Sequence, residues 1–531
     1  MSATAVSNRG VAAAPHSAAA ETGRAILAEG GNAYEAMAGM AATIAVVYPH
    51  MNAIGGDGFW LVREPFGEVR YIEACSVAGS RATVGFYRDR GHDVIPARGP
   101  LAANTAPAAV DGWRLALELS REAGGRLPLG ALLFDAIRHA REGFSVSPCQ
   151  GRTIPKEFAA IVEAPGFADA FMRDGKLYAE GETLRQPKLA DTLDHLARAG
   201  LRDFFDGDVA REMASDLDRI GAPVTREDLS NRRARLRPPL EVRLKGVSVF
   251  NSQPPTQGLV SLMILGVLER LGLRDDESAD FVHLTVEATK RAFLIRDRMC
   301  VDFERMPADP AEFLTPAALD REAAAVDKAR ALPWPPGKTG DGDTIWMGAI
   351  DGEGRAVSYI QSIYWEYGSG CVLPSTGVLM QNRGAAFSLD ETDPNALAPG
   401  RQTFHTLNPA LAVFDDGRTM VYGTMGGEGQ PQTQAQIFAR HAWLGLPIDE
   451  AVSRPRFRLG RSWGDNDSSL KLEPRFASEE LDRLDQMGHR LGTFEHEFDD
   501  EAGHAGMIVR YPDGRIEGAH DPRADGGAAG V

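Results

Sequence analysis

Four hairpin patterns constrain the fold more than any other feature of this sequence. In each, two runs with period-two alternation flank a short turn that contains glycine: residues 55–74 around PFGE, 344–363 around DGEG, 411–424 around DDG, and 507–519 around PDG. Such a pattern predicts a pair of antiparallel strands.

Helical patterns fill the first fifty residues and most of the stretch from about residue 110 to 330. Residues 17–29 stop at Gly30 and Gly31, and residues 32–47 stop before Pro49. Asn32 is placed to cap the second helix, with Glu35 three residues on to complete a capping box. Hairpins at both ends with helices between them predict an α+β protein, in which helices pack outside mainly antiparallel sheets.

The composition is that of a folded, soluble protein and excludes several functions. With 531 residues the chain is longer than one hydrophobic core usually organises. We therefore expect two domains or one large domain built from two interleaved segments. Its net charge of −17 would repel nucleic acid. The longest apolar stretch, residues 37–47, is too short to cross a bilayer, and the N-terminus lacks the pattern of a secretory signal. We therefore expect a cytoplasmic protein without nucleic-acid or membrane partners.

The cysteines and the glycine-rich segments do not point to a cofactor. Cys75, Cys149, Cys300 and Cys371 are scattered without CxxC spacing, which is typical of reduced structural thiols rather than of disulfides or a zinc site. The segments GGDGF and GTMGGEG do not sit between a buried strand and a helix, and neither ends in the Lys-Ser/Thr of a phosphate loop. We predict no metal and no organic cofactor.

A segment rich in proline and glycine interrupts the chain immediately before the second hairpin. Residues 332–343, LPWPPGKTGDGD, have no periodicity and predict an exposed loop that could be cleaved. Thr344 follows directly.

Several strings in this order resemble the γ-glutamyltranspeptidase family: GGNAYEAMAGMAATIAVVYPHMNAIGGDGF, DTIWMGAIDGEGRAVSYIQS, YGSGCVLPSTGVLMQN, GTMGGEG and GAHDPR. The resemblance implies a four-layer αββα sandwich of the N-terminal nucleophile hydrolase type, made as a proenzyme that cuts itself between Asp343 and Thr344. Residues 1–343 would form the large subunit, with 331–343 as processing linker, and residues 344–531 the small subunit. The two would stay together as a heterodimer and form one intertwined catalytic unit, with further pairing left open.

Thr344 is the nucleophile that this resemblance implies. A threonine hydroxyl needs a base, and no side-chain triad is evident in the sequence. The free α-amino group that cleavage would create has an ordinary pKa of about 7.7 to 8.0, so it can accept the proton near pH 7. Without the resemblance and the preceding linker, Thr344 would be interpreted as an ordinary β-branched strand residue.

The resemblance also assigns roles to residues downstream. Ser362 matches a hydroxyl residue that orients the nucleophile, and the backbone N–H groups of Gly426 and Gly427 match the donors to the oxyanion. His405 and Thr406 fall where γ-glutamyl enzymes carry a serine pair near the substrate carboxylate. Considered alone, these residues are a strand serine, a plain turn and a structural histidine.

The sequence departs from the family where a glutamyl group would be recognised. The family's arginine falls on Cys75 and its acidic residue on Ala386, which removes the partners of the α-carboxylate and the α-amino group. Arg383 instead adds a guanidinium that could bind a carboxylate with two hydrogen bonds, unless it simply faces solvent. We expect Arg383, Tyr364 and Cys75 to shape the substrate pocket.

These changes predict an amidohydrolase that acts on a small amide carrying a carboxylate. The strings DTIWMGAID and FHTLNPA look most like oxamate amidohydrolases of the family. One alternative is a γ-glutamyltransferase or glutathione hydrolase that finds its partners elsewhere in the pocket. A second is an inactive binding homologue that is never processed.

Overall fold

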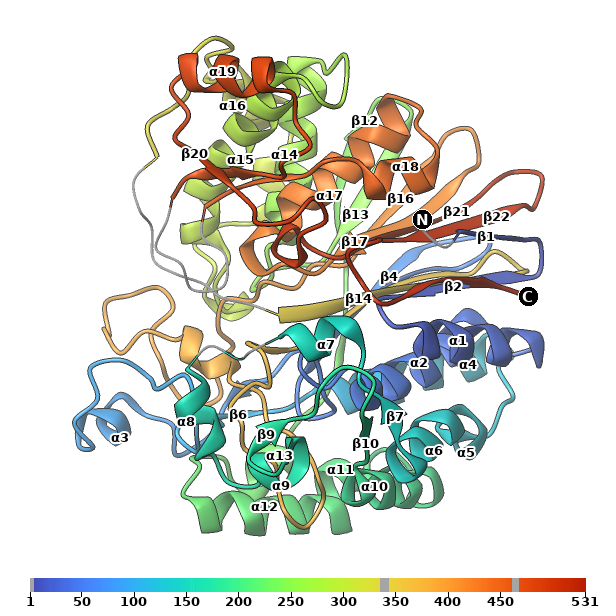
Figure 1. Cartoon of the computed structure of the whole chain (residues 1–531), viewed down its shortest axis with the longest axis vertical. Coiled ribbons are helices and arrows are strands. Elements are labelled where there is room, and N and C mark those ends of the chain that lie inside the picture. Colours follow the sequence, from blue (N-terminus) through green and yellow to red (C-terminus); the bar gives the residue numbers. More distant parts are fainter. Residues whose placement is uncertain (1–3, 154, 156, 335–342, 461–467) are drawn as a thin grey trace.

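Two seven-stranded sheets lie face to face at the centre of the molecule, with helices over the outer face of each (Figure 1). The computed structural model describes residues 4–153, 155, 157–334, 343–460 and 468–531. Within both sheets, every pair of neighbouring strands is antiparallel. The predicted α+β fold with four αββα layers is therefore confirmed.

Each sheet combines strands from distant parts of the chain. The first sheet runs, in spatial order, through β1 (Thr4–Ser7), β22 (Ile516–His520), β21 (Ala505–Arg510), β17 (Thr419–Thr424), β16 (Ala410–Phe414), β13 (Val247–Asn251) and β12 (Leu240–Leu244). The second runs through β11 (Arg235–Arg237), β4 (Val69–Ala74), β3 (Asp57–Arg63), β15 (Ala356–Tyr364), β14 (Asp343–Asp351), β2 (Gly10–Ala14) and β23 (Gly527–Gly530). Both sheets thus mix strands from before and after Thr344.

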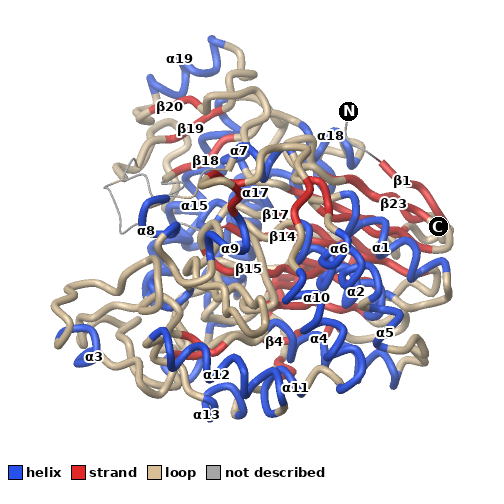
Figure 2. Tube along the Cα trace, turned by 60° about the horizontal axis from the view of Figure 1, so that its bottom comes forward, coloured by secondary structure: helices blue, strands red, loops and turns tan. Residues whose placement is uncertain are grey.

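The helices form two outer layers. On the side of the second sheet, α1 (Ser17–Ala28), α2 (Ala33–Val47) and α4 (Ala109–Glu122) contact the strands, whereas α6 (Phe134–Glu142) packs on α2 and α10 (Pro187–Ala199) packs on α6. On the side of the first sheet, α14 (Gly258–Leu271), α17 (Gln430–Phe438) and α18 (Ile448–Ser453) contact the strands, whereas α15 (Ala279–Met299) and α16 (Pro316–Ala324) pack on α14. Figure 2 shows the strands enclosed between these layers, with long loops around α3 (Val84–Arg88). No helix in the described part of the chain is long and apolar enough to span a membrane.

A layer of buried hydrophobic side chains joins the two sheets. It includes Phe59 and Tyr71 from the second sheet, and Leu411 and Val421 from the first. Trp346 of β14 also lies there and donates a hydrogen bond from its Nε1 to the Ser358 hydroxyl at 3.0 Å. Since β14 and β15 are covered on both faces, the strands that hold the predicted nucleophile and its neighbours are removed from bulk water.

The local predictions agree with the structure at most elements. All four hairpins form, as β3–β4, β14–β15, β16–β17 and β21–β22. Asn32 caps α2 and Glu35 completes the capping box. The prediction of mainly helix across residues 110–330 was incomplete, because β12 and β13 form a further hairpin at the edge of the first sheet and β11 forms the edge strand of the second. That hairpin alternates buried with more exposed residues but is short and follows Pro238 and Pro239, which masked its period.

Candidate active site

Thr344 lies at the start of β14, in the second sheet, and is fully buried. Asp343 is paired with Tyr364 and Ile345 with Gln361, so the strand pairing is irregular at Thr344. Such an irregularity re-aims a side chain relative to regular alternation. The Nε2 of Gln430, the first residue of α17, is 3.4 Å from the Thr344 hydroxyl. The predicted nucleophile is therefore contacted by a residue from the helical layer over the first sheet.

Ser362 lies in β15, the strand next to β14, and is also buried. Its hydroxyl accepts a hydrogen bond from the backbone N–H of Tyr364 at 2.8 Å. On its other side, Ser362 is paired with Asp57 of β3. The structure thus brings Ser362 to the irregular part of the β14–β15 pairing, where Thr344 lies.

Gly426 and Gly427 form a sharp turn between β17 and α17. Their φ angles are +125° and +52°, which only glycine adopts readily. Among the described residues, neither backbone N–H donates a hydrogen bond to another protein group. The Gln257 side chain donates to the carbonyl oxygens of Gly427 and Thr406, at 2.9 Å in both cases. Gln257 therefore links the glycine turn to the loop that carries His405 and Thr406.

Arg383 is buried rather than solvent-facing, with 1% of its surface exposed. It lies in a short 3₁₀ helix (Arg383–Ala386), and its guanidinium carbon is 4.1 Å from the centroid of the Tyr364 ring. One guanidinium nitrogen is 3.4 Å from the Thr406 hydroxyl, whereas Nε and the other terminal nitrogen have no hydrogen-bond partner among the described residues. Burial lowers the pKa of Arg383, and the nearby Tyr364, Asp57 and Cys75 oppose that shift. A buried cation with two unsatisfied donors is costly unless an anion binds it.

Asp57, which the sequence analysis did not single out, connects the loops around this arginine. Its carboxylate accepts hydrogen bonds from the Ser76 N–H and hydroxyl, both at 2.8 Å, and from the Gln381 amide at 3.3 Å. It also lies 3.0 Å from the His405 Nε2. Asp57 is fully buried and its oxygens are occupied by these donors. It therefore supplies a fixed negative charge near Arg383 but has little capacity to bind a substrate ammonium.

His405 is held by both of its ring nitrogens. Nε2 contacts Asp57, and Nδ1 accepts a hydrogen bond from the Leu407 backbone N–H at 3.5 Å. Burial and the charge of Arg383 lower the pKa of His405 to about 4, so its ring is neutral near pH 7. The structure places His405 and Thr406 beside Arg383, where Thr406 contacts the guanidinium directly. His405 is thus suited to positioning this loop.

Cys75 and Ala386, the positions that depart from the family pattern, also lie near Arg383. Burial raises the pKa of the Cys75 thiol far above its usual value, with Asp57 adding to the shift, so the thiol stays protonated. Atoms of Asp57, Cys75 and His405 that can bind metals lie within 4.8 Å of one another. The hydrogen bonds at Asp57 and His405 already occupy their lone pairs, so these residues do not fit a metal ion.

Two residues at the candidate site that sequence reasoning missed share a simple signal. Asp57 lies in GGDGF and Gln430 follows GTMGGEG, two segments that were noted for their glycines. The contacts of a buried carboxylate or a buried amide next to such a turn depend on which loops meet there, and that is decided by the tertiary structure.

The chain is similar over most of its length to known proteins and solved structures. The family model described as Gamma-glutamyltranspeptidase matches residues 19–531. An oxamate amidohydrolase proenzyme of Klebsiella pneumoniae subsp. pneumoniae is 50% identical over 526 residues, which cover 99% of each chain. A glutathione hydrolase-like YwrD proenzyme of Bacillus subtilis is 36% identical over 534 residues, the full length of both chains.

A solved structure has the same fold. The cephalosporin acylase from Bacillus halodurans superposes with a TM-score of 0.91 at 29% identity, covering 99% of this chain and 97% of that one. These relatives are hydrolases and acylases, and they bear out the prediction of an enzyme with an N-terminal nucleophile hydrolase fold.

Proposed function

Because the chain belongs to the γ-glutamyltranspeptidase family, we propose that it is a self-processing threonine amidohydrolase. Its substrate is the amide of a small molecule that carries a carboxylate, with oxamate as the first candidate. The observation that carries this proposal is Arg383, a buried cation beside β15 with two nitrogen donors that no other described residue satisfies. The relative from Klebsiella pneumoniae, an oxamate amidohydrolase proenzyme that is 50% identical to this chain, supports the same substrate.

Self-processing uses the Thr344 hydroxyl and the peptide bond before it. The hydroxyl oxygen attacks the Asp343 carbonyl, the C–N bond breaks, and the acyl group moves to oxygen as an ester. Water then hydrolyses the ester, which leaves a carboxylate on Asp343 and a free amine on Thr344. Before this step the Thr344 nitrogen is a peptide nitrogen and cannot act as a base.

Amide hydrolysis then uses the new amine. It takes the proton from the Thr344 hydroxyl, and the oxygen attacks the substrate carbonyl. The N–H groups of Gly426 and Gly427 stabilise the developing oxyanion. The leaving amine receives the proton, the acyl group remains on Thr344 as an ester, and a water molecule hydrolyses it. Oxamate would yield oxalate and ammonia. The chemistry requires no cofactor.

The two fragments are expected to stay together after cleavage. In the second sheet, β14 and β15 of the small fragment lie between β3 and β2 of the large one. Separation would break both sets of strand hydrogen bonds and expose the core between the sheets.

A γ-glutamyltransferase or glutathione hydrolase is the main alternative. Such an enzyme must bind an α-ammonium, which needs a carboxylate with free oxygens. The carboxylate beside Arg383 is Asp57, and four donors already occupy it. We therefore favour a substrate that has a carboxylate and lacks the ammonium.

The decisive experiment measures the masses of the purified wild-type protein and of Thr344→Ala under denaturing conditions. We expect two fragments divided between Asp343 and Thr344 in the wild type and one chain in the variant. The processed enzyme is then assayed with oxamate and with a γ-glutamyl anilide. An uncut wild-type chain after long incubation would instead favour an inactive binding homologue, and preference for the anilide would favour the transferase.

A further inference from the structure

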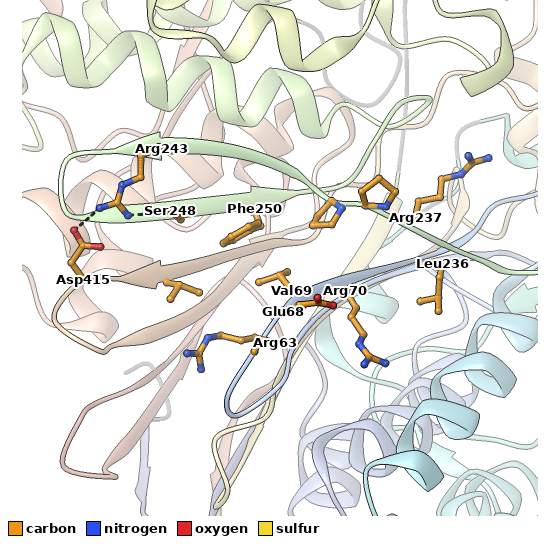
Figure 3. Close-up of a pocket in the computed structure, with 14 residues that line it drawn as sticks. Arg63, Glu68, Val69, Arg70, Leu236, Arg237, Arg243, Ser248, Phe250 and Asp415 are labelled. Carbon is orange, nitrogen blue, oxygen red and sulfur yellow. Dashed lines mark hydrogen bonds and ion pairs between the residues drawn. The ribbon is translucent and has the colours of Figure 1, made fainter.

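A pocket away from the candidate active site lies at the open edge of the sandwich, between the two sheets (Figure 3). It is bordered by the β3–β4 hairpin and β11 of the second sheet and by β12, β13 and β16 of the first. Its volume of about 720 Å³ is within the range of small-molecule sites. None of its lining residues belongs to the candidate active site. We call it the edge pocket.

One part of the edge pocket is apolar. Val69 comes from the hairpin side, whereas Phe250 and Val413 come from the first sheet. All three are half-buried at the margin of the layer that joins the sheets. Leu236, half-exposed on β11, adds another apolar side chain. A flat apolar group of a ligand could bury its surface here.

The charged lining is mainly basic, in a protein whose net charge is −17. Of its four arginines, Arg237 is paired with Glu73 at 2.7 Å and Arg243 with Asp415 at 2.5 Å. The side chains of Arg63 and Arg70 form no hydrogen bond or ion pair within the described residues. Glu68 is the other acid in the lining, and it lies outside ion-pair distance of both.

Of these two arginines, Arg63 is the better placed to bind an anion in the edge pocket. It is paired across the hairpin with Val69, so the two side chains share the face that looks towards the first sheet. Arg63 is half-buried, and burial together with the nearby charge of Arg510 lowers its pKa. The local environment therefore favours an anion next to Arg63.

We propose that the edge pocket binds a small organic anion with an apolar body, of the aromatic carboxylate class. Its carboxylate pairs with the Arg63 guanidinium, and its ring packs against Val69, Phe250 and Val413. A bare inorganic anion would leave the apolar part unused, and an uncharged ring would leave Arg63 unpaired. The site is separate from amide hydrolysis and does not depend on the function proposed above.

The test is calorimetric titration of the full-length protein with 1-naphthoate, repeated with Arg383→Gln so that any binding at Arg383 is identified separately. We expect one site, with affinity reduced about tenfold or more in Arg63→Ala, because a charge-assisted pair is lost. Arg121→Ala, which removes an exposed arginine on α4, is the matched control and should bind like the wild type.

A second pair of variants separates binding from folding. Leu236 is half-exposed, so Leu236→Glu should fold, and its charge should weaken naphthoate binding where Leu236→Gln has little effect. Equal affinity in the wild type and Arg63→Ala, or equal affinity for naphthoate and for neutral naphthalene methanol, would overturn the proposal. So would binding of inorganic phosphate as tight as that of naphthoate.

Discussion

The guanidinium of Arg383 lies over the ring of Tyr364, with its carbon 4.1 Å from the ring centroid. The backbone N–H of the same tyrosine donates to the hydroxyl of Ser362. Tyr364 has a φ of +85°, an unusual value for a residue other than glycine. The turn at Tyr364 therefore links the Arg383 guanidinium to β15, the strand next to the one that carries Thr344.

Arg383→Gln should lower kcat/KM for oxamate by about 10²- to 10³-fold, because it removes a buried charge that pairs with the substrate carboxylate. Arg383→Lys should recover only part of this loss, since an ammonium lacks the planar fork of a guanidinium. Steady-state kinetics gives the values, and denatured masses confirm that both variants still cut themselves. Unchanged kcat/KM in Arg383→Gln would show that the substrate carboxylate binds elsewhere.

Gly426→Ala should lower kcat by about 10²- to 10³-fold while the protein stays folded, because a side chain disfavours the φ of +125° and displaces an oxyanion donor. Gly445→Ala serves as the control. Gly445 also has a positive φ, +75°, but lies in an exposed turn after α17. A similar loss of kcat in both variants would attribute the effect to general strain.

Asp57→Asn should destabilise the fold by roughly 2 to 4 kcal/mol, because an amide group cannot accept from all the donors that the carboxylate satisfies. Asp218→Asn is the control: its exposed ion pair with Arg81 should contribute less than about 1 kcal/mol. Urea unfolding of both variants in the uncut Thr344→Ala background measures the difference. Equal stability of the two variants would argue against a central role for Asp57.

The free energy of unfolding should fall as the pH is lowered from about 6.5 to 4. Burial lowers the pKa of His50 to about 3 and that of His405 to about 4, whereas the same residues in the unfolded chain have pKa values near 6.5. In this window the unfolded chain binds more protons than the folded protein. The free energy of unfolding therefore falls by about 1.4 kcal/mol per histidine for each pH unit. Above pH 6.5 both histidines are neutral in the folded and the unfolded chain, so their contribution to stability no longer changes with pH.

Urea unfolding at several pH values, with the Thr344→Ala chain, measures this slope. His50→Gln should reduce it, because one proton-binding site of the unfolded chain is removed. His496→Gln, which changes an exposed histidine, should leave the slope of the unfolding free energy against pH unchanged. A slope that His50→Gln does not alter would assign the acid sensitivity to other groups.

Local patterns were sufficient to predict much of the secondary structure. The capping box at Asn32 and Glu35 and the four hairpins depend on residues close together in the chain, and they appear as predicted. The β12–β13 hairpin was missed because short strands gain most of their stability from the sheet they join. Its place at the edge of the first sheet depends on β16, more than 150 residues away.

The sequence by itself determined the family, the layered fold and the identity of the expected nucleophile, because motifs and periodicity are properties of neighbouring residues. Only the tertiary structure decided that Arg383 is buried over Tyr364, that His405 is held by Asp57, and that Asp57 is a fully occupied carboxylate. These properties depend on loops separated by up to 348 residues. Burial, charge pairing and hydrogen-bond saturation arise only when such loops are packed together.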